Sequence, residues 1–341
     1  MNEIYDFKTI SSFGDVTSCG VLKRYPEDFK VTETISFLPS GEGDHVYLFI
    51  QKTGCNTDWV ANQLADLAGL KQVDVGYAGM KDRHAVTCQW YSLHMPNQAE
   101  PDWSVLPDEI CVLEKTRHNK KLRTGAIDKN TFELLIRDVS GDTDEIERRL
   151  SLIKTRGFPN YFGPQRFGNQ GANVYKLAGM AKGRRRVSRT QRGMYVSSGR
   201  SYLFNQILKE RVRQENWNKA IAGDVMSLDG SRSVFTEQNI DQTIIDRVEQ
   251  HDIHPAAVLW GRGDIKTSLD AGEIEEKIIS DYPVIKKALE KTDVEISYRS
   301  MRTLVPDLIW KLQNSELLLS FSLPSGAYAT SLMSEFISFP E

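Results

Sequence analysis

The sequence predicts an α+β protein in which the end of the chain returns to a sheet begun near its start. Three patterns indicate this: strands and helices alternate through the first 150 residues, helical spacing dominates from Gly171, and a strand pattern returns after Met301. A single strand and helix at the end cannot form a stable unit alone. We therefore expect them to join the first sheet, which makes the middle of the chain an insertion.

The first 150 residues contain mixed strand and helix signals. Alternation or short apolar runs predict strands, and a polar cap followed by apolar residues at helical spacing predicts a helix. In order, we expect strands at 45–50, 73–79, 86–93, 110–113 and 131–139, a helix from Asn56 or Thr57 to Gly69, and a helix from Asp142 or Thr143 to Gly157.

The rest of the chain is expected to be mainly helical until its last segment. Apolar residues recur at helical spacing near 203–212, 244–248 and 274–279. Leu317–Leu323 then alternates as a strand does, and a Pro-Ser-Gly turn precedes a final helix from about Ala329 to Phe336.

Composition indicates a soluble cytoplasmic protein. Of the 341 residues, 40% are hydrophobic and 26% charged, which is ordinary for one or two globular domains. We find no apolar run of about 18 residues and no signal-peptide pattern at the start, so we expect no membrane partner. The four cysteines form no CxxC pair, and we expect them to be reduced thiols.

Charge is distributed unevenly along the chain. Residues 151–209 carry twelve Lys and Arg and no Asp or Glu, which leaves −15 for the rest of a chain whose net charge is −3. A solvated surface with chance clustering is the simple alternative. However, eight of the twelve are arginines, whose planar fork matches phosphate, and aromatic residues are interleaved among them. This favours binding of nucleic acid, and of RNA in particular.

Common catalytic motifs are absent from the sequence. It contains no P-loop, GxGxxG, HExxH or GxSxG pattern. His251 and His254 are three residues apart but have no third ligand nearby, so we expect helix-end residues and no metal site.

The densest cluster of reactive side chains is Gly76–Ala85, just after a short apolar strand. Its glycines allow the backbone to approach a ligand, and Asp82 stands between Lys81 and Arg83. Two neighbouring cations are expected to keep a partly buried Asp82 ionised, as a nucleophile requires. The alternative is a tight turn in which the aspartate only caps or pairs.

This loop, Gly-Tyr-Ala-Gly-x-Lys-Asp-Arg-x-Ala, resembles the catalytic loop of the TruD family of pseudouridine synthases. Further segments resemble the same family in the same order. They are Pro26–Glu33, Lys121–Gly125, Asn130–Phe132, Pro159–Gly168, Ser201–Gln206 and Leu323–Thr330.

The resemblance implies isomerisation of uridine 13 in transfer RNA. The N1 glycosidic bond is cut, the uracil turns, and C5 is joined to C1′. Asp82 matches the family's essential aspartate, which either attacks C1′ or removes a sugar proton. No cofactor is expected, because the reaction is redox-neutral and transfers no phosphate.

The resemblance also implies residues that hold the substrate. Phe29 matches the aromatic residue that stacks on the flipped uracil, and Asn130 and Phe132 match residues lining the site. From sequence alone, the sheet core is the favoured interpretation of Phe29 and the alternative for Phe132, and a turn before a strand is the alternative for Asn130. Lys23 corresponds to a basic residue near the aspartate, with a solvated lysine as the alternative. Tyr328 could abut the base or simply pack on a helix.

We therefore predict a mixed, mainly antiparallel catalytic domain, formed by 1–154 and 305–341, and an inserted, mainly helical α/β domain at 155–304. A basic cleft between them is expected to bind transfer RNA, and the protein is expected to be a monomer. The cations expected to contact RNA are Lys81, Arg83, Lys121, Arg123, Arg166, Arg184, Arg185, Arg186, Arg189 and Arg192.

Two rival functions follow from the same residues. A non-catalytic RNA-binding or RNA-folding protein would use the cations and leave Asp82 without a role. A glycosidase or nuclease would use paired carboxylates, with Glu33 as the second.

Overall fold

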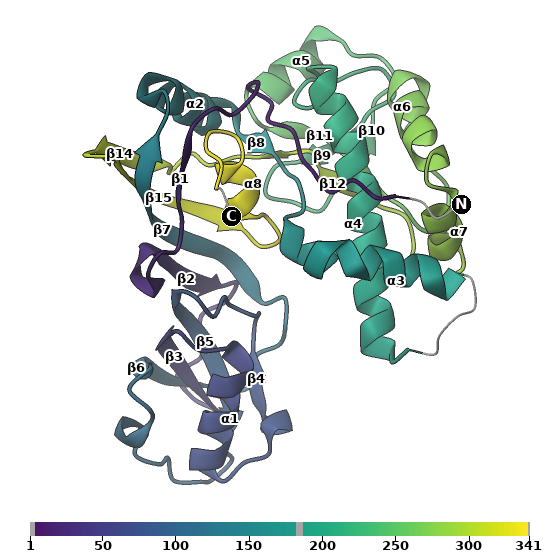
Figure 1. Ribbon diagram of the computed structural model, residues 1–341. Coiled ribbons are helices and arrows are strands. Elements are labelled where there is room, and N and C mark those ends of the chain that lie inside the picture. Colours follow the sequence, from purple (N-terminus) through teal and green to yellow (C-terminus); the bar gives the residue numbers. More distant parts are fainter. Residues whose placement is uncertain (1–3, 182–186, 340–341) are drawn as a thin grey trace. The chain divides into compact units, whose positions relative to one another are not determined.

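The computed structural model describes residues 4–181 and 187–339 (Figure 1). By its internal contacts the chain forms two compact units. The sheet unit contains residues 17–146, 305–326 and 337–339, and the helical unit contains residues 4–16, 147–304 and 327–336. Compared with the predicted inserted domain, the helical unit also takes in residues 4–16, 147–154 and 327–336; the division into a catalytic and an inserted domain stays a prediction.

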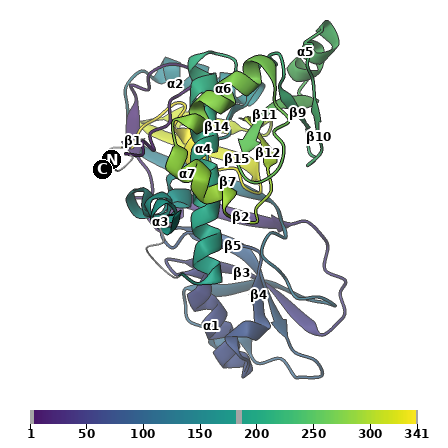
Figure 2. The ribbon, with the colours of Figure 1, turned by 90° about the vertical axis from the view of Figure 1, so that its right-hand side faces the viewer.

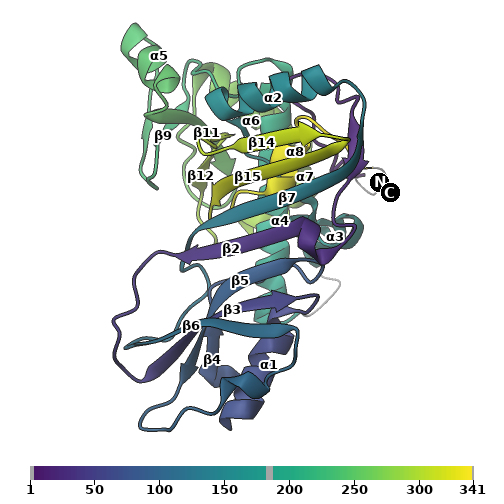
Figure 3. The same ribbon diagram turned by 90° about the vertical axis from the view of Figure 1, so that its left-hand side faces the viewer.

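The sheet unit is built on a nine-stranded, mainly antiparallel sheet within the described residues. Figure 3 shows its main strands in the order β14-β15-β7-β2-β5-β3-β6, with β1 paired to β7 and β4 to β5. The strands are β1 Cys19–Val21, β2 Phe29–Ile35, β3 His45–Thr53, β4 Val75–Tyr77, β5 Val86–His94, β6 Ile110–His118, β7 Ile127–Ser140, β14 Ile309–Gln313 and β15 Glu316–Pro324.

The strand near the end of the chain returns to this sheet, as the sequence predicts, whereas the final helix, Ala329–Met333, belongs to the helical unit. Strand β15 pairs antiparallel with β7, placing Phe321 opposite Phe132 and Leu323 opposite Asn130. Apolar residues on one face of β15, such as Phe321, are buried while alternate residues are not, which explains its period of two. The mixed α+β fold is therefore confirmed.

Helix α1 (Thr57–Ala68) packs on the sheet unit. Its apolar stripe, including Val60 and Leu64, is buried against residues of β3, β4 and β5. Gly69 ends the helix with φ of +65°, a left-handed conformation that glycine adopts without steric cost. This confirms the helix predicted from Thr57 to Gly69.

The helical unit contains a helix group and a smaller sheet. Figure 2 shows α6 and α7 beside the long helix α4, which packs on both and on α3. The helices are α2 Thr143–Arg156, α3 Ala172–Ala181, α4 Arg189–Arg213, α5 Gln242–Glu249, α6 Leu269–Ser280, α7 Pro283–Glu290 and α8 Ala329–Met333, with α2 beginning at the end of the sheet unit.

Strands are also present where the sequence indicated helices and loops. The described residues form a four-stranded sheet in the order β10-β9-β11-β12 and a small β13-β8 pair. These strands are β8 Phe158–Pro159, β9 Val225–Leu228, β10 Val234–Thr236, β11 Ile253–Leu259, β12 Ser297–Ser300 and β13 Arg302–Thr303. All of these strands except β11 have two to four residues, and the seven-residue β11 is buried at nearly every position, so its sequence shows no alternation.

No helix in the described parts of the chain, 4–181 and 187–339, has the length and apolar character needed to cross a membrane.

Candidate active site

Asp82 lies on the loop between β4 and β5 in the sheet unit. Its carboxylate forms an ion pair with Lys23, whose Nζ is 2.5 Å from Oδ2, and the two side chains are 32% and 25% exposed. Lys23 has φ of +59°, a left-handed conformation that is uncommon for residues other than glycine. Such backbone strain is frequent at functional sites. The Asp82 side chain is thus paired with a lysine and within reach of solvent.

The loop before Asp82 is fixed by buried polar side chains. The Lys81 backbone N–H donates to Thr57 Oγ1 at 3.0 Å, and Gln89 Nε2 donates to the Gly79 carbonyl at 3.0 Å. The Thr57 hydroxyl in turn donates to Gln89 Oε1 at 3.1 Å. Helix α1 and strand β5 therefore hold the loop from two sides.

The Lys81 side chain contacts Glu33 and Asn130, two partners that the sequence did not indicate. Its ammonium lies 2.9 Å from Glu33 Oε2 and donates to Asn130 Oδ1 at 2.6 Å. The Lys81 and Glu33 side chains are 6% and 0% exposed. With its ammonium buried and paired, Lys81 is not placed at the surface to contact an RNA phosphate.

The buried Glu33 carboxylate also bears on the glycosidase alternative. Burial raises the pKa of Glu33, and the Lys81 ammonium opposes that shift. A carboxylate sealed from solvent and paired with Lys81 is poorly placed to act on a substrate. The structure thus gives no support to Glu33 as the second carboxylate of a glycosidase.

Arg83 follows Asp82 and is exposed. Its Nε donates to the Gly54 carbonyl at 3.2 Å. The predicted contact of Arg83 with RNA stays a prediction.

One predicted substrate-binding ring, Phe29, lies beside the ion pair, and a second, Phe132, contacts Phe29. The Lys23 ammonium is 3.9 Å from the centroid of the Phe29 ring. Phe29 meets Phe132 edge-on at 6.1 Å between centroids, and Phe132 stacks on Phe321 at 5.1 Å. Phe29 and Phe132 are 5% and 9% exposed, so both rings also belong to the sheet core.

Asn130 is oriented by its contact with Lys81. It lies opposite Glu33 in the β2–β7 register. Because an ammonium only donates hydrogen bonds, the amide oxygen of Asn130 must face Lys81. The amide nitrogen of Asn130 therefore points away from Lys81, and its two N–H groups are not used by this contact.

Tyr328 belongs to the helical unit, at the residue preceding α8. Its ring packs against Phe162 at 6.0 Å between centroids, and it is half-buried. The structure thus shows the packing contact considered for Tyr328, and its contact with a base stays a prediction.

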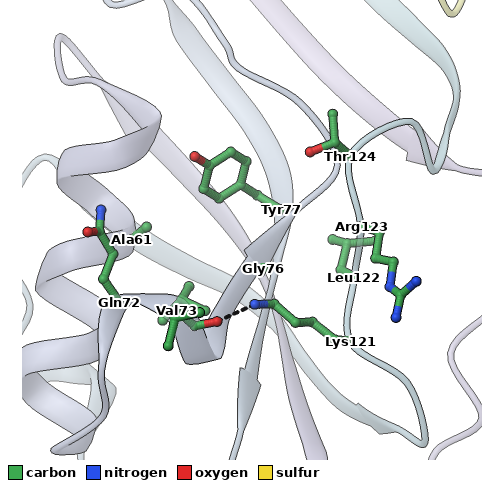
Figure 4. Close-up of a pocket in the computed structure, with 10 residues that line it drawn as sticks. Ala61, Gln72, Val73, Gly76, Tyr77, Lys121, Leu122, Arg123 and Thr124 are labelled. Carbon is green, nitrogen blue, oxygen red and sulfur yellow. Dashed lines mark hydrogen bonds between the residues drawn. The ribbon is translucent and has the colours of Figure 1, made fainter. Parts of the chain in front are cut away.

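Lys121 and Arg123 line a pocket of about 700 Å³ in the sheet unit (Figure 4). The Lys121 ammonium donates to the Val73 carbonyl, and Arg123 is exposed. Gly76 forms part of the wall, and a Cβ added there would lie 2.3 Å from the Leu122 carbonyl oxygen. Glycine is therefore required at position 76, where strand β4 approaches the backbone of Leu122.

The remaining predicted RNA contacts lie in the helical unit. Arg166 donates to Ser201 Oγ at 3.2 Å and its guanidinium lies 5.3 Å from the Phe162 ring centroid, so it is partly engaged within the fold. Arg189 and Arg192 are exposed in the first turn of α4. The arginines at positions 184, 185 and 186 lie outside the described residues.

His254 lies on strand β11 and not at a helix end as expected. It is buried, with Nε2 2.9 Å from Asp229 Oδ1, and its Nδ1 accepts from Arg302. Among the described residues, no group of three or more His, Cys, Asp and Glu is arranged to hold a metal ion.

Comparison with known proteins identifies the family. The family model for tRNA pseudouridine synthase D (TruD) matches residues 14–181 and 174–336. The chain belongs to the TruD family.

Curated relatives match nearly the whole chain. It is similar to the tRNA pseudouridine synthase D of Methylococcus capsulatus, with 44% identity over 96% of this chain and 93% of the relative. The protein of the same name from Hydrogenovibrio crunogenus is 41% identical, over 95% and 94%.

A solved structure has the same fold. The crystal structure of the putative tRNA pseudouridine synthase D from Methanosarcina mazei matches with a TM-score of 0.72 and covers 98% of this chain and 95% of its own, at 19% identity. At that identity the likeness establishes the fold alone.

Proposed function

We propose that this protein isomerises uridine to pseudouridine in transfer RNA, at position 13, with Asp82 as the catalytic residue. Family membership and the near-complete match to relatives named tRNA pseudouridine synthase D support the reaction and the class of substrate. The structural observation that carries the assignment of Asp82 is its partly exposed carboxylate, paired with Lys23 beside the Phe29 ring.

The reaction breaks one bond to C1′ and forms another. The N1–C1′ bond of the uridine is cleaved, the uracil rotates, and C5 bonds to C1′; C5 then loses its proton and N1 gains one. In one route the Asp82 carboxylate adds to C1′ and is later displaced, and in the other it removes a sugar proton. Both routes require an ionised carboxylate, whose charge the Lys23 ammonium stabilises at 2.5 Å.

The side chains around the ion pair suit an extruded uracil. A base leaving its stack costs a few kcal/mol, and stacking on an aromatic ring returns about 1–3 kcal/mol. We assign this contact to Phe29. Its ring now lies under the Lys23 ammonium, so the lysine side chain has to shift when a base stacks there. The Asn130 amide nitrogen, directed away from Lys81, is the donor we assign to a uracil carbonyl.

Exposed cations on both units are proposed to hold the phosphates of the RNA. Arg123 and Lys121 line the pocket in the sheet unit, while Arg189 and Arg192 are exposed on α4. Phosphate contacts position the RNA, and contacts with the base select the uridine. Binding is accordingly expected to weaken as salt rises.

The test replaces Asp82 by Asn. This variant should bind transfer RNA and fold as the wild type does, but release no tritium from RNA labelled at uracil C5. The control is Asp66→Asn, since Asp66 is an exposed aspartate on α1 and its loss should leave the rate unchanged. Normal tritium release by the Asp82 variant would remove this residue from the mechanism.

The same reaction mixtures separate the proposed reaction from its rivals. An isomerase leaves RNA of unchanged length carrying pseudouridine, whereas a glycosidase releases free uracil and a nuclease shortens the strand. Mapping of pseudouridine along the product tests position 13. We also propose a cytoplasmic monomer, which light scattering and cell fractionation test.

A further inference from the structure

Lys52 has a buried ammonium that none of the steps above uses. It is the next-to-last residue of β3, and its side chain is completely buried. Nζ donates to two backbone carbonyls, that of Cys55 at 2.8 Å and that of Asp82 at 2.9 Å. The second acceptor is the main chain of the residue to which we assign catalysis.

A buried ammonium is costly for the fold. Moving a charge from water to the interior is unfavourable, and burial accordingly lowers the pKa of Lys52. The two acceptors are neutral carbonyls, which satisfy the donors but compensate the lost hydration only in part. An apolar side chain of similar volume would fill the same space at lower cost, so stability alone does not explain a lysine here.

The position of the ammonium ties two segments together. Lys52 joins the Asp82 backbone to the turn between β3 and α1, where Cys55 lies. From the same turn, the Gly54 carbonyl accepts a hydrogen bond from Arg83 Nε. Lys81, the residue before Asp82, donates its backbone N–H to the hydroxyl of Thr57 at the start of α1. Three successive loop residues are thus fixed to the β3–α1 connection.

We propose that Lys52 is a positioning residue for Asp82. By holding the backbone carbonyl of Asp82, Lys52 fixes the position of the Asp82 carboxylate. The proposal rests on the proposed function of Asp82. Catalysis by a carboxylate is sensitive to placement, since a displacement of about 1 Å can cost about 100-fold in rate. Lys23 holds the carboxylate end of Asp82, and Lys52 holds its backbone end.

The test compares two buried lysines. In Lys52→Met the side chain keeps its approximate length but loses the donors, and we expect kcat for tritium release to fall about 100-fold, with KM and the Kd for transfer RNA within about twofold of wild type. The matched control is Lys209→Met. Lys209 is 6% exposed, and its ammonium donates to the Lys8 carbonyl at 2.8 Å and to the Asp6 carboxylate at 2.7 Å. All three residues belong to the helical unit, so the loss of this ammonium should leave kcat unchanged.

A second variant covers the case in which Lys52→Met does not fold. Lys52→Gln keeps an N–H donor, but its side chain is one atom shorter and cannot reach both carbonyls, so kcat should still fall at least about tenfold at unchanged KM. Wild-type kcat in the folded Met variant, or in the Gln variant if only that one folds, would overturn the proposal.

Hydrogen exchange of backbone amides 78–85 gives a readout that does not depend on activity. Exchange there should accelerate in the folded Lys52 variant and stay at the wild-type rate in Lys209→Met. If the wild-type protein releases no tritium, the proposed function has failed, and exchange alone decides whether Lys52 holds the loop. Unchanged exchange in the Lys52 variant then counts against the proposal.

Discussion

Removing the Lys81 ammonium should lower the free energy of unfolding, because this ammonium is the cation paired with the buried Glu33 carboxylate. Lys81 pairs with Glu33 at 2.9 Å, and the two side chains are 6% and 0% exposed. Lys81→Met keeps most of the side-chain volume but leaves Glu33 without its cation. Water cannot replace that cation at a fully buried carboxylate.

The magnitude follows from burial. Breaking a buried ion pair by deleting one partner costs about 3–5 kcal/mol, because the remaining charge is uncompensated. Replacing Glu33 by Gln in the same chain removes that charge. The double variant with Lys81→Met and Glu33→Gln should therefore recover most of the stability that Lys81→Met alone loses.

The loss should also depend on pH, with a definite sign. Burial already raises the pKa of Glu33, and Lys81 is the largest influence acting against this. A carboxyl whose folded-state pKa is raised above its unfolded value destabilises the fold as pH rises through that folded pKa. Without Lys81 the pKa of Glu33 rises further, so the penalty of Lys81→Met should be greatest at alkaline pH and shrink toward acid.

Urea unfolding at pH 6 and pH 8 measures both effects. The free energy of unfolding is compared for the wild type, the two single variants and the double variant, and the difference between Lys81→Met and wild type should be smaller at pH 6. Equal differences at the two pH values, or a double variant no more stable than Lys81→Met, would refute the reasoning.

Two further predictions concern the charged side chains that face solvent. Lys23→Met should lower kcat about tenfold or more, since a hydrogen bond to a charged group contributes about 1.5–3 kcal/mol, and single-turnover tritium release measures it. Wild-type kcat in this variant would contradict the role given to the ion pair. Arg123→Met should weaken binding of transfer RNA at unchanged kcat and lower the slope of log K against log salt by about 0.7–0.9; an unchanged slope would exclude a phosphate contact by Arg123.

Periodicity predicts the elements with one buried face well. Helix α2 has Ile146, Leu150 and Ile153 completely buried, and their spacing is visible in the sequence. The strands β9, β10 and β12 show no period because they have only three or four residues, and the seven-residue β11 shows none because it is buried on both faces. Apolar residues without a period cannot be told from a buried helix by sequence.

The sequence singles out the loop around Asp82 but not the contacts that hold this loop in place. The loop around Asp82 stands out through its glycines and charges, whereas Lys52, Thr57 and Gln89 carry no local signal. They reach the loop only because β3, α1 and β5 pack around it. A lysine ending a strand resembles a solvated residue until the sheet is assembled.

The pair that Lys81 forms with Glu33 shows why neighbours in sequence are poor guides to ion pairs. Consecutive residues of an extended loop point in different directions, so Lys81 turns inward to Glu33 while Asp82 faces Lys23, which is 59 residues away. The arrangement separates two tasks. One cation compensates a buried carboxylate beside the loop, and another stabilises the partly exposed carboxylate to which we assign catalysis. If one lysine paired with both carboxylates, a substrate that displaced this lysine from Asp82 would also remove it from Glu33. With two lysines, Glu33 keeps its cation when the substrate binds.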